Sequence, residues 1–221
     1  MRLHPRYTTR SFWIGHDLYR PADHQVVATW ARQAVGAAIA ASGVPDGALV
    51  LDAGSGNGAY GLAWAQRHRV VALDYSRSLI TDNPLGRRVE GTIFALPFAD
   101  RTFDLVFAGA VLHHVGDVVA ALRELRRVSR GVVALVEPNR DNPAMFVFGA
   151  VVPEERGTLR FSAGWLRRQV ATAGLRVRHC EPIGWIPPNK IPAWSLPLFR
   201  RLPVRYPLGL HLLLIADRDG P

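Results

Sequence analysis

Glycines and a carboxylate at the end of one apolar run are the residues best suited to bind a ligand. Residues 50–61 read VLDAGSGNGAYG. Their glycines at 56, 58 and 61 fit the G-x-G-x-x-G pattern that places a helix N-terminus against a pyrophosphate. The first glycine after the apolar run is Gly54, however, and Asp52 comes before it, which gives D-x-G-x-G-x-G. A carboxylate there would repel a pyrophosphate and suits a cationic ligand, such as an aminocarboxypropyl sulfonium.

Two adjacent histidines, His113 and His114, follow another apolar run and are candidate catalytic residues. An imidazole has a pKa suited to removing a proton from a hydroxyl group. Glu137, after a later apolar run, is a second candidate base. The alternative for all three is local hydrogen bonding that orders a loop. The sequence shows no metal-binding constellation: three other histidines lie in the leader without ligand spacing, and Cys180 is the only cysteine.

Apolar runs that alternate with helical segments must position these residues. Strands are expected at 47–54, 69–74, 87–93, 103–109, 131–138, 175–182 and 209–217, and helices at 22–41, 59–66, 117–128 and 163–173, the last capped by Ser162. This alternation predicts an α/β fold with a doubly covered, mostly parallel sheet. The last two strands have no predicted helix between them, so we expect them to pair antiparallel at the edge.

Four blocks occur in a recognisable order between about residues 48 and 139: VLDAGSGNG, VVALDYS, ALPFADRTFDLVFAGAVLHHVGD and GVVALVEPN. With them the chain resembles class I S-adenosylmethionine-dependent methyltransferases, in particular the small-molecule branch of the ubiquinone and menaquinone biosynthesis type. The resemblance implies a single Rossmann-like, doubly wound domain. Its seven-stranded sheet would have the order 3-2-1-4-5-7-6 and an antiparallel edge strand, and its cofactor would be S-adenosyl-L-methionine.

The resemblance also implies roles for single residues of the cofactor site. The glycine loop would wrap the methionine part, with Asp52 near its ammonium group. Asp74 would accept hydrogen bonds from the ribose, and Tyr75 would flank the adenine. Relatives commonly have Gly-Asp before LPF, where this chain has Gly91 and Thr92, so the usual carboxylate contact to adenine is absent. The full predicted cofactor set is Asp52, Gly54, Ser55, Gly56, Gly58, Asp74, Tyr75, Thr92, Ile93 and Ala108.

The predicted organisation has an N-terminal lid segment and helix at 1–43 and a methyltransferase core at 44–221. Between the last two strands lies an insert, residues 184–207, rich in proline and aromatic residues. Long loops inside compact domains are usually functional. We therefore expect Trp13 and Tyr19 of the leader and Trp185 and Trp194 of the insert to contact the acceptor. Two alternatives stay open for the insert: a basic, aromatic surface with Arg200, Arg201 and Arg205 that docks on anionic lipid or RNA, and plain packing without ligand contact. The predicted reaction is methyl transfer to a small, largely apolar acceptor: a metabolite, a natural product or a lipid-like molecule.

Two other functions stay open, and the formal net charge of +9 supports the first of them. One is methylation of nucleic acid, RNA in particular. It is disfavoured because the position after the fourth strand reads AGAV and carries no base-flipping motif. The other is a non-catalytic S-adenosylmethionine-binding protein. No apolar run reaches the roughly 18 residues of a membrane span, and the leader has no apolar signal region. We expect a cytoplasmic protein and leave peripheral membrane contact and the oligomeric state open.

Overall fold

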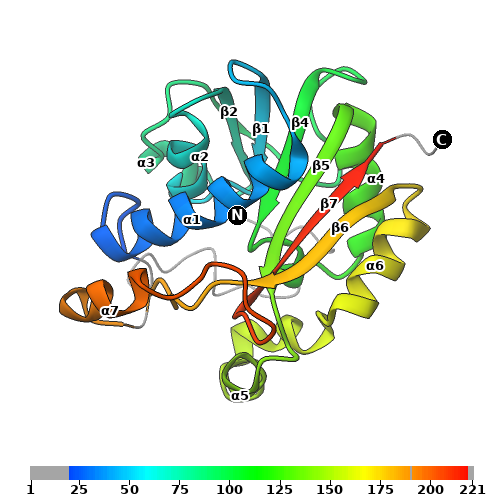
Figure 1. Cartoon of the computed structure of the whole chain (residues 1–221). Coiled ribbons are helices and arrows are strands. Elements are labelled where there is room, and N and C mark those ends of the chain that lie inside the picture. The colour runs from blue at the N-terminus through cyan, green and yellow to red at the C-terminus, as the bar shows by residue number, and fades with distance from the viewer. Residues whose placement is uncertain (1–19, 190, 219–221) are drawn as a thin grey trace.

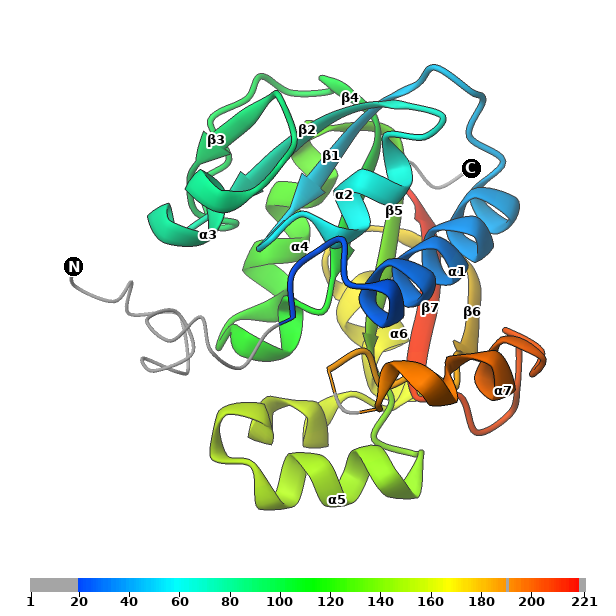
Figure 2. The same cartoon turned by 90° about the vertical axis from the view of Figure 1, so that its left-hand side faces the viewer.

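The computed structural model describes residues 20–189 and 191–218, which form one seven-stranded sheet with helices on both faces (Figures 1 and 2). The strand order is β3-β2-β1-β4-β5-β7-β6, as the resemblance implied. This confirms the predicted α/β class and the Rossmann-like arrangement. The strands are β1 Leu49–Ala53, β2 Arg69–Asp74, β3 Arg88–Glu90, β4 Phe103–Gly109, β5 Ser129–Pro138, β6 Arg176–Ile183 and β7 His211–Asp217.

The antiparallel strand of the sheet is β7. It pairs antiparallel with both β5 and β6, whereas β1 to β5 pair in parallel. Since β6 also runs antiparallel to β7, it has the direction of the parallel strands and forms the edge itself. The last two strands therefore pair as predicted, with the antiparallel strand one position in from the edge. Covered on both faces, β7 buries every residue from His211 to Ala216, which explains its continuous apolar sequence.

Two hydrophobic clusters, one on each face, hold the helices against the sheet. Helices α1 (Gln25–Ser42), α2 (Ala59–Trp64) and α3 (Arg77–Asp82) contribute to one cluster, which contains the fully buried Trp30 and Trp64. Helices α4 (Val118–Val128) and α6 (Ala163–Thr172) contribute to the other. Ser162 caps α6 as predicted, because its side chain accepts a hydrogen bond from the amide of Trp165.

Several short helices were not predicted. They are α3, α5 (Pro143–Val151), α7 (Leu196–Arg200) and the 3₁₀ helices η3 (Leu112–His114), η4 (Pro153–Arg160) and η5 (Ala193–Ser195). Most span two turns or fewer, too short to show a hydrophobic period. Helix α5 is longer, but it contains no polar residue and so has no apolar-polar alternation to detect.

The segments after β4, β5 and β6 all lie beyond the carboxyl edge of the parallel strands. Helix α5 and η4 follow β5, and η5 and α7 lie in the connection between β6 and β7. Figures 1 and 2 show α5 and α7 together at this end of the sheet. Open α/β sheets bind their ligands outside the carboxyl ends of the strands. These elements therefore surround the place where a ligand site is expected.

Candidate cofactor and acceptor site

The glycine loop after β1 depends on backbone conformations that glycine adopts readily. Gly54, Gly56 and Gly58 have φ angles of 80°, 49° and 88°. A Cβ atom at Gly54 would collide with the side chain of Val111, and one at Gly58 with Asn83. At Gly56 a Cβ atom would meet no described atom within 4 Å. Gly56 therefore borders open space at the centre of the loop, where a ligand can approach the backbone.

Asp74 lies at the end of β2 and ties the glycine loop to that strand. Its buried carboxylate accepts hydrogen bonds from the amides of Gly56 at 2.7 Å and of Ser76 at 2.8 Å. Burial raises the pKa of Asp74 to about 6, and the hydrogen bonds from these amides limit the rise. The structure thus brings Asp74 and the glycine loop together, as the resemblance implied.

Asp52, at the mouth of the same loop, is completely buried at the end of β1. Neither of its carboxylate oxygens has a hydrogen-bond partner of ordinary geometry among the described residues, although the backbone of Gly61 lies close to them. Burial raises the pKa of Asp52 to about 7; the charge of Asp74 adds to this rise, and the backbone of Gly61 opposes it. A buried carboxylate without partners is unfavourable unless a cation or a donor meets it. The site therefore fits a ligand that presents a positive group at this point.

The residues predicted to contact the adenine lie in two kinds of environment. Tyr75 and Thr92 are half-buried, and the Thr92 hydroxyl accepts a hydrogen bond from the amide of Phe94 at 3.3 Å. The side chains of Ile93 and Ala108 pack in the hydrophobic cluster shared with α4 and α6. These two residues can shape the site, but their side chains offer no polar contact.

Asn83, which sequence reasoning missed, fastens the glycine loop from the opposite side. Its amide nitrogen donates to the Ser55 hydroxyl at 3.2 Å and to the Gly56 carbonyl at 3.1 Å. Its side-chain carbonyl oxygen accepts a hydrogen bond from the backbone amide of Leu85 at 3.1 Å. Asn83 follows a short helix outside every motif, so no local signal in the sequence could have found it.

The buried Glu137, at the end of β5, orders the turn after β4. Its Oε1 atom accepts hydrogen bonds from the backbone amides of Val111 and Leu112 at 3.0 and 2.8 Å. Its Oε2 atom accepts the amide of His113 at 3.3 Å and lies 2.7 Å from Nδ1 of the same residue. These contacts occupy the carboxylate with backbone and histidine partners. They support the loop-ordering alternative for Glu137 over the role of a general base.

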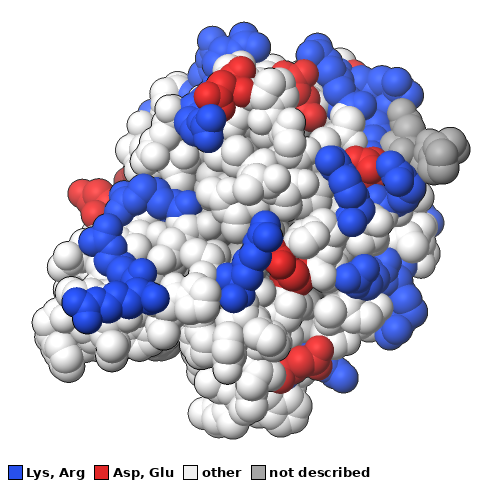
Figure 3. All heavy atoms as spheres, viewed as in Figure 1, with Lys and Arg blue, Asp and Glu red and all other residues white. Residues whose placement is uncertain are grey.

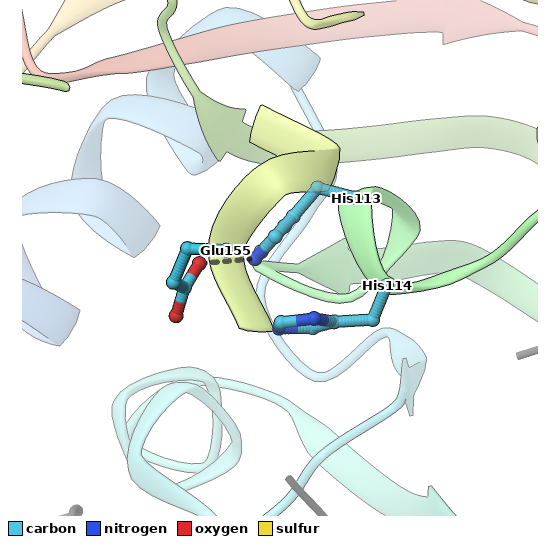
Figure 4. A group of neighbouring side chains, drawn as sticks. All are labelled: His113, His114 and Glu155. Atoms are coloured by element: carbon cyan, nitrogen blue, oxygen red, sulfur yellow. Dashed lines mark ion pairs between the residues drawn. The ribbon is translucent and has the colours of Figure 1, made fainter. Parts of the chain in front are cut away.

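His113 lies between two carboxylates, those of Glu137 and Glu155. Its Nε2 atom is 3.2 Å from Oε2 of Glu155 in η4 (Figure 4). Burial alone lowers the pKa of His113, but the hydrogen bonds to Glu137 and Glu155 outweigh it and raise the pKa to about 9. A histidine that keeps its proton at neutral pH cannot serve as a general base. This charge state disfavours His113 as a general base, and its catalytic role stays a prediction.

His114 has the opposite electrostatics. Burial, reinforced by the charge of His113, holds the pKa of His114 well below its ordinary value, although a hydrogen bond with the backbone of Glu154 opposes the fall. Its imidazole is therefore neutral at pH 7. One ligand-type atom each of His113, His114 and Glu155 lie within 4.8 Å of one another, a grouping that the sequence did not indicate. Both ring nitrogens of His113 already have carboxylate partners, Glu137 and Glu155. This geometry therefore favours the protonated, positively charged form of the His113 ring.

Of the predicted acceptor residues, Trp185 and Trp194 are the two that the structure describes. The Trp185 indole donates a hydrogen bond to the Pro203 carbonyl at 3.0 Å and contacts the Tyr206 ring in a tilted arrangement, so its contacts lie within the insert. The Trp194 side chain is 82% exposed and does not line an enclosed cavity, since η5 turns it toward solvent. Trp13 and Tyr19 lie outside the described residues.

The comparisons with known proteins agree with this fold and site. Residues 51–135 match the methyltransferase domain family. A demethylmenaquinone methyltransferase of Roseiflexus castenholzii is 32% identical over 51% of this chain and 52% of its own length. A malonyl-[acyl-carrier protein] O-methyltransferase of Erwinia pyrifoliae is 39% identical over 39% of this chain and 35% of its own. The chain thus spans about half or less of these relatives' length.

Among solved structures, a protein of Thermotoga maritima described as a possible histamine N-methyltransferase superposes with a TM-score of 0.67. The superposition covers 89% of this chain and 91% of the other, and the two are 17% identical. This likeness concerns the fold alone. Sheet order, glycine loop and family match together define the domain of a class I S-adenosylmethionine-dependent methyltransferase. Its relatives include methyltransferases of the quinone-biosynthesis type.

The cofactor of this family, S-adenosylmethionine, fits the residues present. Asp52 offers a buried carboxylate to its ammonium and sulfonium end, and the open space at Gly56 admits it to the loop. Asp74 would hold the ribose. When bound, the cofactor supplies a methyl group on a positively charged sulfur, so the transfer requires no further activation of the leaving group.

Proposed function

We propose that this chain transfers a methyl group from S-adenosylmethionine to a small, largely apolar acceptor. The observation that carries the enzymatic part is the buried carboxylate of Asp52, which has no hydrogen-bond partner of ordinary geometry among the described residues and lies in the strand that leads to the open backbone of Gly56. A carboxylate in this setting suits a cationic methyl donor better than an anionic dinucleotide. The family match of residues 51–135 supports the same reading.

The proposed place for the acceptor lies between the glycine loop and the insert, next to Arg20. The Asn57 side chain donates to the Arg20 carbonyl at 2.9 Å, and the Arg20 guanidinium donates to the Pro188 carbonyl at 3.1 Å. Arg20 thus joins the cofactor loop to residues 184–207. Tyr19 precedes Arg20 in the sequence, and we propose that the leader and the insert enclose the acceptor from two sides. Enclosure by apolar segments excludes water and suits an apolar molecule.

The protein's part in the reaction is alignment, exclusion of water and, for a hydroxyl acceptor, removal of its proton. His114 is the candidate to accept that proton, because its imidazole is neutral and the residue follows β4 at the carboxyl edge of the sheet. His113 and Glu137 act as positioning residues, since together they fix the turn that carries His114. The relative named a demethylmenaquinone methyltransferase supports an acceptor of apolar character.

The test is an assay of the purified chain with S-adenosylmethionine carrying a labelled methyl group. Separate reactions contain a lipid-soluble metabolite extract, a water-soluble metabolite extract and RNA. We expect label in a small molecule of the lipid-soluble extract. Gly56→Val is the matched control, because its side chain would occupy the open space of the loop and should abolish both cofactor binding and labelling. Label in RNA alone, or cofactor binding with no transfer to any fraction, would contradict the proposal.

A further inference from the structure

All the large hydrophobic side chains that are exposed among the described residues belong to two segments. They are Phe146, Val147 and Val151 of α5, and Trp194, Leu198, Leu202, Tyr206 and Leu208 of the connection between β6 and β7. Both segments lie beyond the carboxyl edge of the sheet (Figures 1 and 2). Single exposed hydrophobics are ordinary on protein surfaces, but their concentration at one end of a domain indicates an interaction site.

Helix α5 turns apolar side chains toward solvent. Its sequence, PAMFVFGAV, contains no polar side chain, and Val151 is 72% exposed. Ala144, Val147 and Val151 follow one another at helical spacing, and all three are exposed. Gly149, in contrast, is buried near Thr158 of η4. A surface helix of a water-soluble domain normally presents polar residues to solvent, so the outer face of α5 needs a partner.

The second segment combines exposed apolar and basic side chains. Leu196 is buried and anchors α7, whereas Trp194 and Leu198, 82% and 67% exposed, face outward. Arg200 and Arg201 follow directly and are exposed, with no ion-pair partner within the described part of the chain. Figure 3 shows basic side chains on the lobe that contains α7, with no acidic side chain on that lobe in this view. The segment offers cations beside apolar anchors.

The two segments are joined where they meet at the sheet edge. The Asn142 side chain, which caps α5, donates to the Leu208 carbonyl, and the Asn139 side chain donates to the Gly209 carbonyl at 2.9 Å. We call residues 143–151 and 194–208 together the docking rim. Because the rim surrounds the end of the sheet where the methyl group is transferred, whatever covers it also faces the acceptor site.

We propose that the docking rim seats on the surface of a bilayer that contains anionic lipids, from which the acceptor enters the site. This rests on the proposed function and names a lipid-soluble molecule as its substrate class. Apolar and aromatic side chains insert at the boundary of headgroups and acyl chains, and exposed arginines pair with lipid phosphates. No helix in the described ranges is long and apolar enough to cross a membrane, so the contact would be interfacial.

RNA is the other polyanion that a basic, aromatic surface could bind. The uncharged, apolar face of α5 argues against it, because that face offers no donor to a phosphate backbone. A bilayer accounts for both segments of the rim, and RNA for the basic one only.

The direct test is co-sedimentation of the full chain with vesicles of phosphatidylcholine, with and without about one third phosphatidylglycerol. We expect binding to the anionic vesicles that weakens as salt is raised. Phe146→Ser with Val147→Ser, and separately Trp194→Ser with Leu198→Ser, should each lower the partition coefficient ~10-fold or more. Since these side chains are exposed, the melting temperature and S-adenosylhomocysteine affinity should stay unchanged.

A matched pair isolates the charge contribution. Arg200→Ser with Arg201→Ser should weaken binding to anionic vesicles, while Arg123→Ser with Arg168→Ser, on exposed positions of α4 and α6, should not. Three results would each overturn the proposal. The full chain could fail to bind either vesicle, or the control pair could weaken vesicle binding as much as the Arg200 and Arg201 pair does. The rim could also bind single-stranded RNA in place of vesicles. Vesicle binding without labelling of any lipid would instead contradict the proposed function alone.

Discussion

The backbone amide of Gly56 donates a 2.7 Å hydrogen bond to Oδ2 of Asp74. This contact joins the loop after β1 to the end of β2, so the carboxylate assigned to the ribose also sets the conformation of the loop assigned to the methionine part. Asn83 holds the same loop from the other side through Ser55 and the Gly56 carbonyl. The loop is therefore ordered by side chains outside its own motif, and its binding properties should depend on them.

Replacing Asp74 with alanine should weaken S-adenosylhomocysteine binding ~30-fold or more. The variant loses charge-assisted hydrogen bonds to the ribose, which are worth about 2–3 kcal/mol, and it releases the Gly56 amide. Isothermal titration measures the change. Asp74→Asn is the matched control, because it keeps an acceptor oxygen for the amide and should lose less affinity. Unchanged affinity in Asp74→Ala would contradict the ribose assignment.

Affinity for S-adenosylhomocysteine should rise with pH because of Asp52. Burial raises the pKa of Asp52 to about 7, so the carboxylate of the free protein ionises as pH passes through 7. If only the ionised form pairs with the ligand ammonium, affinity should increase roughly tenfold between about pH 6 and pH 8. In the free protein the same raised pKa makes ionisation unfavourable, so stability falls as pH rises from about 4 toward 7.

Titration calorimetry across this pH range checks the prediction. Asp52→Asn should bind weakly, with a flatter pH profile, and should remove the stability loss of the free protein. A profile in Asp52→Asn as steep as in the native chain would assign the pH dependence to another group.

His113→Ala should lower the free energy of unfolding by about 3–5 kcal/mol, because it leaves Glu137 and Glu155 facing each other without the cation between them. Urea denaturation measures the change. Glu155→Gln, which keeps a hydrogen-bonding group beside the ring, should cost clearly less. A small loss in His113→Ala would mean that the carboxylates find other partners or take up protons.

His114→Ala should reduce turnover ~10²–10⁴-fold at nearly constant S-adenosylhomocysteine affinity if the imidazole accepts the acceptor's proton. The measurement is single-turnover methyl transfer at saturating cofactor, with His114→Gln as a variant of similar bulk. Normal turnover in both variants would indicate an acceptor nitrogen or carbon that needs no base.

Removal of divalent metal ions should leave turnover unchanged. Although ligand-type atoms of His113, His114 and Glu155 lie close together, both ring nitrogens of His113 are engaged by carboxylates. Dialysis against dipicolinate, followed by assay with and without added Zn²⁺, is the measurement. Activity that disappears and returns with one metal would make this cluster a metal site.

Local sequence patterns were enough to predict the strands, the glycine loop and the carboxylates near the ends of β1 and β2. Apolar runs, turn glycines and helix caps are local signals, because each reflects the environment of a few consecutive residues. Asp52, Asp74 and Glu137 could therefore be placed at strand ends before the fold was known. The predicted limits of α1, at 22–41, differ by a few residues from Gln25–Ser42, since capping by His24 fixes the start.

The contacts between groups that are distant in the sequence became visible in the folded chain alone. Glu155 reaches His113 from η4, Asn83 reaches the glycine loop from the end of α3, and α5 presents an apolar face to solvent. None of these follows from local periodicity, because each depends on how the chain returns across the carboxyl edge after a strand. Glu155, from a separate segment, helps to hold His113 in its charged form. The residues next to His113 in the sequence give no sign of this contact.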